Sequence, residues 1–152
     1  NDVRFIQNAD PNRNWPYPGR GNDGNGSASI FALQKWMLEI QPKAMLDLHT
    51  FGRLVMQPSV SSEQDKAKLD ALAQEMGHLS GYDPVSIGNK RDGYAINYYY
   101  WKGKCVSFLI EIGPGPSHAA PVSAIQTESD KTYKMFLLFM KKSVEIELTG
   151  TP

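Results

Sequence analysis

The sequence has 152 residues, and its 16 Lys and Arg balance 16 Asp and Glu, so the formal net charge is zero. This length fits one ordinary domain, and the lack of a basic excess argues against a nucleic-acid partner. A single cysteine, Cys105, excludes an internal disulfide framework. The longest apolar run, MFLLFM, is far shorter than the roughly 18–20 residues of a membrane span, so we expect no membrane partner.

The first 42 residues predict a short strand, a long loop and a helix. Val3–Gln7 alternates in polarity, as a strand does. Residues 10–29 are rich in Pro, Gly and Asn, which predicts a loop, and loops of this length are often functional. Ser29 is expected to cap the helix and Pro42 to stop it. The apolar face of this helix is expected to contain Ile30, Leu33, Met37 and Ile40.

The middle of the chain predicts two strands and a second helix. Residues 44–49, AMLDLH, are apolar on both faces apart from Asp47, which is typical of a strand covered on both sides. Residues 53–58, RLVMQP, predict a short strand. The helix is expected to begin at Ser61 or Ser62, followed by acidic residues that suit its dipole, and to end at Gly81. Its apolar stripe is expected to contain Leu69, Leu72, Met76 and Leu79.

The last third predicts a loop, a buried strand and a long helix. Residues 83–104 are expected to be a mixed loop with short extended pieces, in which Tyr98, Tyr99 and Tyr100 form wall or core. CVSFLIEIG, residues 105–113, is a strong candidate for a buried strand. A helix from about Val122 to Glu147 is expected to close the chain.

Helices that alternate with buried strands predict an α/β fold with helices on both faces of the sheet. In such sheets, ligands bind beyond the carboxyl ends of the strands. His49 ends one buried strand and Glu111 lies near the end of another. The pattern therefore predicts that these two polar side chains meet at one edge of the sheet.

Three groups of residues are candidates for chemistry, each with a plainer interpretation. Glu111 is costly to bury unless it is paired or functional, although a strand-end Glu can simply reach solvent or an arginine. His49 could bind a metal or a backbone carbonyl, and no HxxE, HxH, HExxH or CxxC pattern supplies further ligands. Asn12 and Arg13 could clamp a carboxylate, or form an Asx-turn with a solvated arginine.

Together these stretches carry a family resemblance. DPNRNW, a helix, DLHTFG and GYAINYYYWKGKCVSFLIEIG follow the order seen in the zinc carboxypeptidases of the M14 family. The chain resembles the C-terminal half of such an enzyme. The resemblance implies that residues 1–152 are part of a single catalytic domain. Its implied fold is a three-layer α/β/α fold with a mixed, mostly parallel sheet that is incomplete at its N-terminus.

The resemblance also implies roles for individual residues. Asn12 and Arg13 match an Asn-Arg pair that helps to bind the terminal carboxylate of a peptide substrate. His49 matches the third zinc ligand, and Glu111 matches the glutamate that acts as general base. In the implied reaction the zinc ion polarises the scissile carbonyl, and Glu111 takes a proton from the attacking water and returns it to the leaving amine.

The chain departs from the family pattern at several positions. The HxxE motif, which supplies the first two zinc ligands, and an upstream substrate-polarising arginine have no counterpart. The position of the substrate-capping tyrosine falls near Asn89, and Tyr94 is the candidate replacement. The specificity-pocket position falls on Ile96, an apolar residue, and the next position, usually acidic, is Asn97. His118 falls at an aromatic wall position of the pocket.

Three functional hypotheses remain open at this point. The first is a zinc metallocarboxypeptidase whose remaining ligands lie upstream, so that this chain alone is inactive. Its location is expected to be secreted or periplasmic by resemblance only. The second is a hydrolase of the same fold that acts on peptidoglycan peptides, side-chain-linked glutamates or N-acyl amino acids; Lys90 and Arg91 would favour a carboxylated substrate. The third is a metal-free, non-catalytic binding domain.

Overall fold

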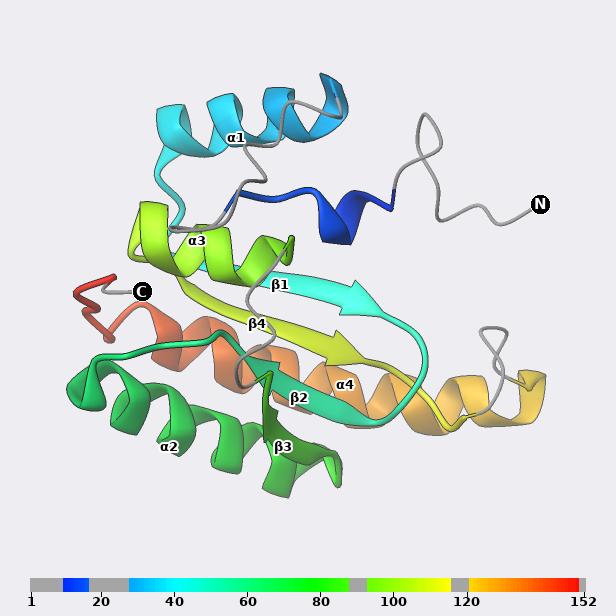
Figure 1. The fold of residues 1–152 in the computed structure, drawn as a ribbon. Helices are drawn as coiled ribbons and strands as arrows, with labels where there is room; N and C mark the ends of the chain where they lie inside the picture. The colour runs from blue at the N-terminus through cyan, green and yellow to red at the C-terminus, as the bar shows by residue number, and fades with distance from the viewer. Residues whose placement is uncertain (1–9, 17–27, 88–92, 116–120, 151–152) are drawn as a thin grey trace.

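A mixed sheet lies between two layers of helices (Figure 1). The structure, a computed structural model, describes residues 10–16, 28–87, 93–115 and 121–150. Within these residues the strands lie in the order β1-β4-β2-β3. β1 pairs with β4 and β2 with β3 in parallel, whereas β2 and β4 are antiparallel. The strands are β1 (Ala44–His49), β2 (Leu54–Gln57), β3 (Asp83–Ser86) and β4 (Val106–Glu111). The predicted three-layer fold with a mixed, mostly parallel sheet is confirmed.

Four α-helices and one short 3-10 helix surround this sheet in the described part of the chain. The 3-10 helix spans Pro11–Arg13. The α-helices are α1 (Ala28–Ile40), α2 (Glu63–Ser80), α3 (Ala95–Gly103) and α4 (Val122–Ser143). None of these helices is long and apolar enough to cross a membrane.

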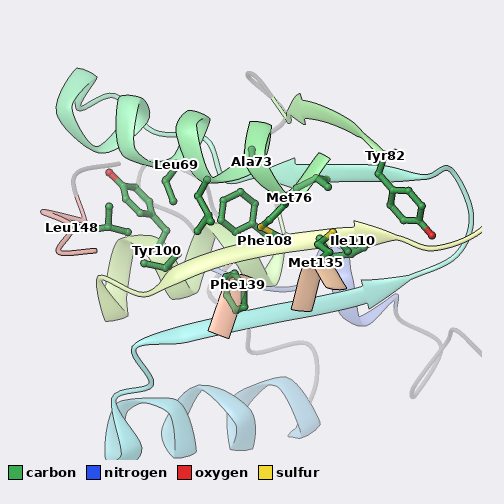
Figure 2. Close-up of a cluster of buried hydrophobic side chains, with 13 residues drawn as sticks. Leu69, Ala73, Met76, Tyr82, Tyr100, Phe108, Ile110, Met135, Phe139 and Leu148 are labelled. Atoms are coloured by element: carbon green, nitrogen blue, oxygen red, sulfur yellow. The ribbon is translucent and has the colours of Figure 1, made fainter. Parts of the chain in front are cut away.

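The main core lies between the sheet and the helices α2 and α4. Figure 2 shows side chains of α2 and α4 converging on β4. β4 alternates as a strand covered on both sides should: Phe108 and Ile110 enter this core, and Leu109 packs on the opposite face against Ile96 of α3. Glu111 continues the Leu109 side, so it points to the face that α3 covers.

Most predicted elements are present, with small differences at their ends. Ser62 caps α2 by accepting the Asp65 N–H at 3.2 Å, and Gly81 ends it in the left-handed conformation at φ +69°. Ser29 is not a cap, because α1 already begins at Ala28. α4 ends at Ser143, so its predicted extension to Glu147 is wrong. The predicted strand Val3–Gln7 lies outside the described residues.

The helix α3 was not expected, because residues 83–104 were predicted to be mainly loop. Residues 95–100 of this helix are all buried, so they show no alternation between an apolar and a polar face. The N-cap residue, Tyr94, makes no side-chain capping hydrogen bond. A helix without amphipathic period or capping signal cannot be recognised by pattern, and only tertiary packing stabilises it.

Candidate functional site

The carboxyl ends of β1 and β4 bring His49 and Glu111 together. The two residues are partners in the parallel register of these strands. Met45, two alternations before His49, packs against the clusters under α1 and α3, so His49 projects to the same face as Glu111. The structure therefore places both side chains side by side at one sheet edge, as the sequence predicted.

The His49 ring nitrogen Nε2 has two polar neighbours. It lies 3.1 Å from Oδ1 of Asp47 and 3.0 Å from Nδ2 of Asn12. With a proton on Nε2, the ring can donate to Asp47; without it, the ring can accept from Asn12. The hydrogen bond to Asp47 raises the pKa of His49, against the opposing effect of burial, and the charges of Asp47, Glu111 and Asp10 add to the rise. The cluster therefore favours a charged imidazole at moderately acidic pH.

Asn12 connects the strand end to α3. Its Nδ2 faces His49, and its Oδ1 accepts the backbone N–H of Ala95 at 2.9 Å, in the first turn of α3. Asn12 itself is held by Asp10, whose side chain accepts the Asn12 backbone N–H at 2.9 Å. Both ends of this buried amide are therefore used, which fixes the distance between His49 and the start of α3.

Arg13 is exposed beside Asn12 and lies over an aromatic ring. Its guanidinium carbon is 4.6 Å from the centre of the Tyr94 ring, a cation–π arrangement, and its Nη1 donates to the Asn12 carbonyl at 2.8 Å. Tyr94 is the candidate for the capping tyrosine, so the structure brings this candidate to the predicted carboxylate clamp. Asn12 thus contacts His49, whereas Arg13 contacts Asn12 and Tyr94, and the role of this pair as a carboxylate clamp stays a prediction.

The loop that carries Arg13 is in tight contact with Gly93. The Trp15 N–H donates to the Gly93 carbonyl at 3.2 Å, and the two residues form an isolated antiparallel bridge. A β-carbon at position 93 would lie 2.1 Å from the Arg13 carbonyl carbon, and Gly93 has φ +77°. Only glycine permits this approach.

The Glu111 carboxylate stands against the turn between β1 and β2, which contains a cis Thr50–Phe51 peptide bond. Oε2 of Glu111 is buried. A β-carbon at Gly52 would lie only 3.2 Å from the β-carbon of Glu111, so glycine leaves room for this side chain. The Gly52 N–H donates to the Gly113 carbonyl at 3.0 Å, which ties this turn to the end of β4.

A buried network supports this end of β4 from the layer of α4. Tyr82 accepts the Gly113 N–H at 3.3 Å and donates from its hydroxyl to Glu128 at 2.7 Å. Glu128, which is buried, also accepts from Arg53 at 2.5 Å. Burial and the neighbouring carboxylate raise the pKa of Tyr82 to about 12, so its hydroxyl stays a donor at neutral pH.

A hollow of about 270 Å³ opens beside His49. Its lining includes apolar side chains of Trp15, Ile30 and Leu33, and the polar residues Asp47 and His49. The hollow thus lies between α1 and the end of β1.

The remaining pocket predictions have mixed outcomes. Ile96 is fully buried in a cluster with Ile87 and Leu109, so its side chain belongs to the core below the site, and its role in specificity stays a prediction. Asn97 is buried too, and its Oδ1 accepts the Ser59 N–H at 2.9 Å. Four further predicted positions lie outside the described residues: Asn89, Lys90, Arg91 and His118.

The described residues fit one part of a metal site. A catalytic zinc ion needs three protein ligands. Within the described ranges, no group of three or more His, Cys, Asp or Glu side chains could hold a metal ion. His49 can present one nitrogen ligand next to the Glu111 carboxylate when its ring is neutral. A complete zinc site would need further ligands from outside these ranges.

Two functional neighbours escaped the sequence prediction. Asp47 was noted only as a polar interruption of a strand, yet it lies two residues before His49 and so on the same face. The period of two along a strand could have identified it. Gly93 gave no signal, because its contact with Arg13 joins residues 80 positions apart in the sequence.

Comparison with known proteins identifies the fold. No protein-family model matches the sequence, and no similar curated protein is found. Among solved structures, the chain is similar to the crystal structure of thrombin activatable fibrinolysis inhibitor (TAFI), with a TM-score of 0.73 and 17% sequence identity. The described chain has a carboxypeptidase-like fold. The match covers 90% of this chain but 42% of the solved one, so this chain spans less than half of that protein's length.

Proposed function

We propose that this chain is the C-terminal part of a zinc-dependent carboxypeptidase domain, which removes the last residue of peptides with a free C-terminal carboxylate. The observation that carries the proposal is the in-register pair of His49 and Glu111 at the carboxyl ends of adjacent parallel strands. The carboxypeptidase-like fold supports it. By family resemblance, we also propose a secreted or periplasmic location.

Each residue has a defined task in this proposal. Glu111 accepts a proton from the attacking water and returns it to the leaving amine. Arg13 binds the terminal carboxylate through its planar fork of N–H donors, and Asn12 orients His49 and contributes an amide to the same clamp. His49 supplies one of the ligands of the zinc ion. That ion, when bound, polarises the scissile carbonyl and acidifies its water.

Glu111→Gln tests the proposed base because it keeps the size of the side chain but removes its proton affinity. In the natural polypeptide that contains this chain, loaded with zinc, we expect kcat to fall about 10²–10⁴-fold with little change in KM. The substrate is an N-blocked peptide with a free C-terminal carboxylate, and its C-terminal amide is the negative control. Glu145→Gln, at an exposed position after α4, is the matched control and should leave kcat unchanged. Near-normal kcat in Glu111→Gln would refute the proposed mechanism.

A second candidate is a non-catalytic binding domain of the same fold. It is favoured by the polar partners that His49 Nε2 already has, since this nitrogen can donate to Asp47 or accept from Asn12. Zinc titration of the natural polypeptide by calorimetry separates the two candidates. Binding of one zinc ion that is lost in His49→Ala supports the enzyme, and the absence of zinc binding supports the binding domain.

A further inference from the structure

The backbone that follows Glu111 is held through both polar groups of Gly113. The Gly113 N–H donates to the Tyr82 hydroxyl at 3.3 Å, and the Gly113 carbonyl accepts the Gly52 N–H at 3.0 Å. Glu111 itself pairs in register with Leu54, the first residue of β2. The end of β4 is therefore joined to the turn between β1 and β2 and to the residue that precedes β3.

The Glu128 carboxylate of α4 holds the partners of this strand end. It accepts the Tyr82 hydroxyl at 2.7 Å and the Arg53 guanidinium at 2.5 Å, and Lys131 Nζ lies 3.5 Å from the same carboxylate. Glu128 is only 3% exposed. A buried carboxylate is costly unless it is paired, and hydrogen bonds that involve a charged group are strong and directional. Glu128 therefore fixes two segments that come from other parts of the sequence.

The backbone of Arg53 also depends on this network. Arg53 has φ +54°, in the left-handed region that residues with a side chain rarely adopt. Its carbonyl accepts the Asp83 N–H at 2.9 Å, while its guanidinium is bound by Glu128. Such a conformation persists only where the surrounding structure holds it. The ion pair therefore stabilises the turn whose residues meet Glu111 and Gly113.

We propose that Glu128 is a positioning residue for Glu111. Through Tyr82 and Arg53 it fixes the backbone beside and after Glu111, and so the place of the Glu111 carboxylate. The network lies on the α4 side of the sheet, whereas Glu111 points to the side that α3 covers, so the network acts through the strand backbone. The inference rests on the proposed function, in which Glu111 is the base. A displacement of about 1 Å at a reacting group can cost about 10²-fold in rate.

A second buried pair of the same chemistry provides the control. The Tyr100 hydroxyl donates to Asp65 at 2.9 Å, and Tyr100 is as fully buried as Tyr82. Figure 2 shows the two tyrosines at opposite ends of the main core. Tyr82→Phe and Tyr100→Phe each remove one hydroxyl that donates to a carboxylate, so we expect comparable losses of stability. Only Tyr82 lies beside the end of β4 that carries Glu111.

Steady-state kinetics of the two variants separate positioning from stability. The protein is the natural polypeptide that contains this chain, loaded with zinc and assayed well below the Tm of either variant. We expect Tyr82→Phe to lower kcat about 10–10²-fold with little change in KM. Tyr100→Phe should keep the kcat of the unmodified protein, because a loss of stability alone does not change the turnover of folded molecules. Equal kcat in the two variants would overturn the inference.

Glu128→Gln tests whether Tyr82 acts together with the carboxylate. Glutamine keeps the size of the side chain but removes the charge that binds Arg53. Because Tyr82 and Glu128 belong to one network, the loss of kcat in the double variant should be smaller than the product of the two single losses. A loss equal to that product would show that the two residues act independently, and Glu128 would then not be the positioning residue. If Glu128→Gln does not fold, Tyr82→Phe alone decides.

Amide hydrogen exchange follows the strand end without catalysis. NMR of the same polypeptide measures exchange of the Gly52 and Gly113 amide protons. We expect both to exchange about tenfold faster in Tyr82→Phe than in Tyr100→Phe, because only the first variant removes a partner of Gly113. Failure of the unmodified protein to hydrolyse the peptide would refute the proposed function. Unchanged exchange rates in Tyr82→Phe would instead overturn the inference, because the strand end would then be held without this network.

Discussion

The contact between Gly93 and Arg13 predicts that Gly93→Ala disturbs the candidate site without touching its functional groups. A β-carbon at position 93 would lie 2.1 Å from the carbonyl carbon of Arg13, whereas ordinary contact begins at 3.4 Å. The two backbone segments must therefore move apart by about 1 Å or more. The Trp15–Gly93 hydrogen bond, now 3.2 Å, would then be broken, and the Ala95–Asn12 bond would be stretched.

The cost of this substitution has two parts. Alanine at a φ of +77° costs about 1–2 kcal/mol of backbone strain. Breaking the Trp15–Gly93 hydrogen bond costs about 0.5–1.5 kcal/mol, and stretching the Ala95–Asn12 bond costs up to about the same. We therefore expect Gly93→Ala to lower the free energy of unfolding by about 2–5 kcal/mol.

Gly81→Ala separates the two parts. Gly81 also has positive φ, +69°, but a β-carbon there meets no atom within 4 Å, so this variant measures the backbone strain alone. Urea unfolding at neutral pH measures the stability of both variants. Under the proposed function, the KM for a peptide substrate is then measured for both variants of the natural polypeptide that contains this chain. We expect Gly93→Ala to be less stable than Gly81→Ala and to have the larger rise in KM, because Arg13 and Asn12 are displaced. Equal free energies of unfolding would show that the segments separate without cost, and the argument for Gly93 as a positioning residue would fail.

Three further predictions concern buried groups. Asp65→Ala should lower the free energy of unfolding by about 2–4 kcal/mol, measured by urea unfolding, because Oδ2 of Asp65 accepts from Tyr100, Thr149 and Gly150. The hydrogen bond from Arg53 lowers the pKa of Glu128 in spite of burial. The ionised Glu128 carboxylate therefore stabilises the fold fully above the ordinary pKa of 4.5, and this stabilisation is lost as pH falls through the lowered pKa. Unfolding midpoints measured from pH 7 to 3 should fall more steeply in the unmodified protein than in Glu128→Gln. Ile96→Asp should destabilise the fold by about 3 kcal/mol or more, against about 0.5–1.5 kcal/mol for Ile96→Val, because this side chain is fully buried; an unchanged Tm with a new preference for basic C-terminal residues would instead place Ile96 in an open pocket.

The strands and their ends could be predicted because their pattern is local. β1 and β4 are apolar runs that end in polar residues, and the carboxyl ends of parallel strands lie at the same sheet edge. This rule predicts that His49 and Glu111 share an edge, whereas their pairing in register depends on β1 and β4 being neighbours in the sheet. The cap of α2 at Ser62 and its end at Gly81 are likewise encoded within a few residues.

The parts that could not be predicted depend on contacts between distant segments. α3 has no polar face, since the layers around it bury residues 95–100 completely. The sequence does not reveal that the amide of Asn12 joins His49 to Ala95, residues that lie 37 and 83 positions away. Leu33 and Ile40 belong to the predicted apolar face of α1 and are nevertheless exposed, because the pattern of a helix shows which face is apolar but not whether that face has a partner.

The surroundings of His49 show the same limit of sequence reasoning. Asp47, Leu48 and His49 all belong to the end of β1, which in the described residues pairs with β4 alone. The alternation of the strand places Asp47 on the same face as His49, so this neighbour is encoded locally. Asn12, the other polar neighbour of His49, comes from a loop 37 positions away. The strand pattern therefore determines which face His49 occupies, whereas distant segments determine which groups it meets there.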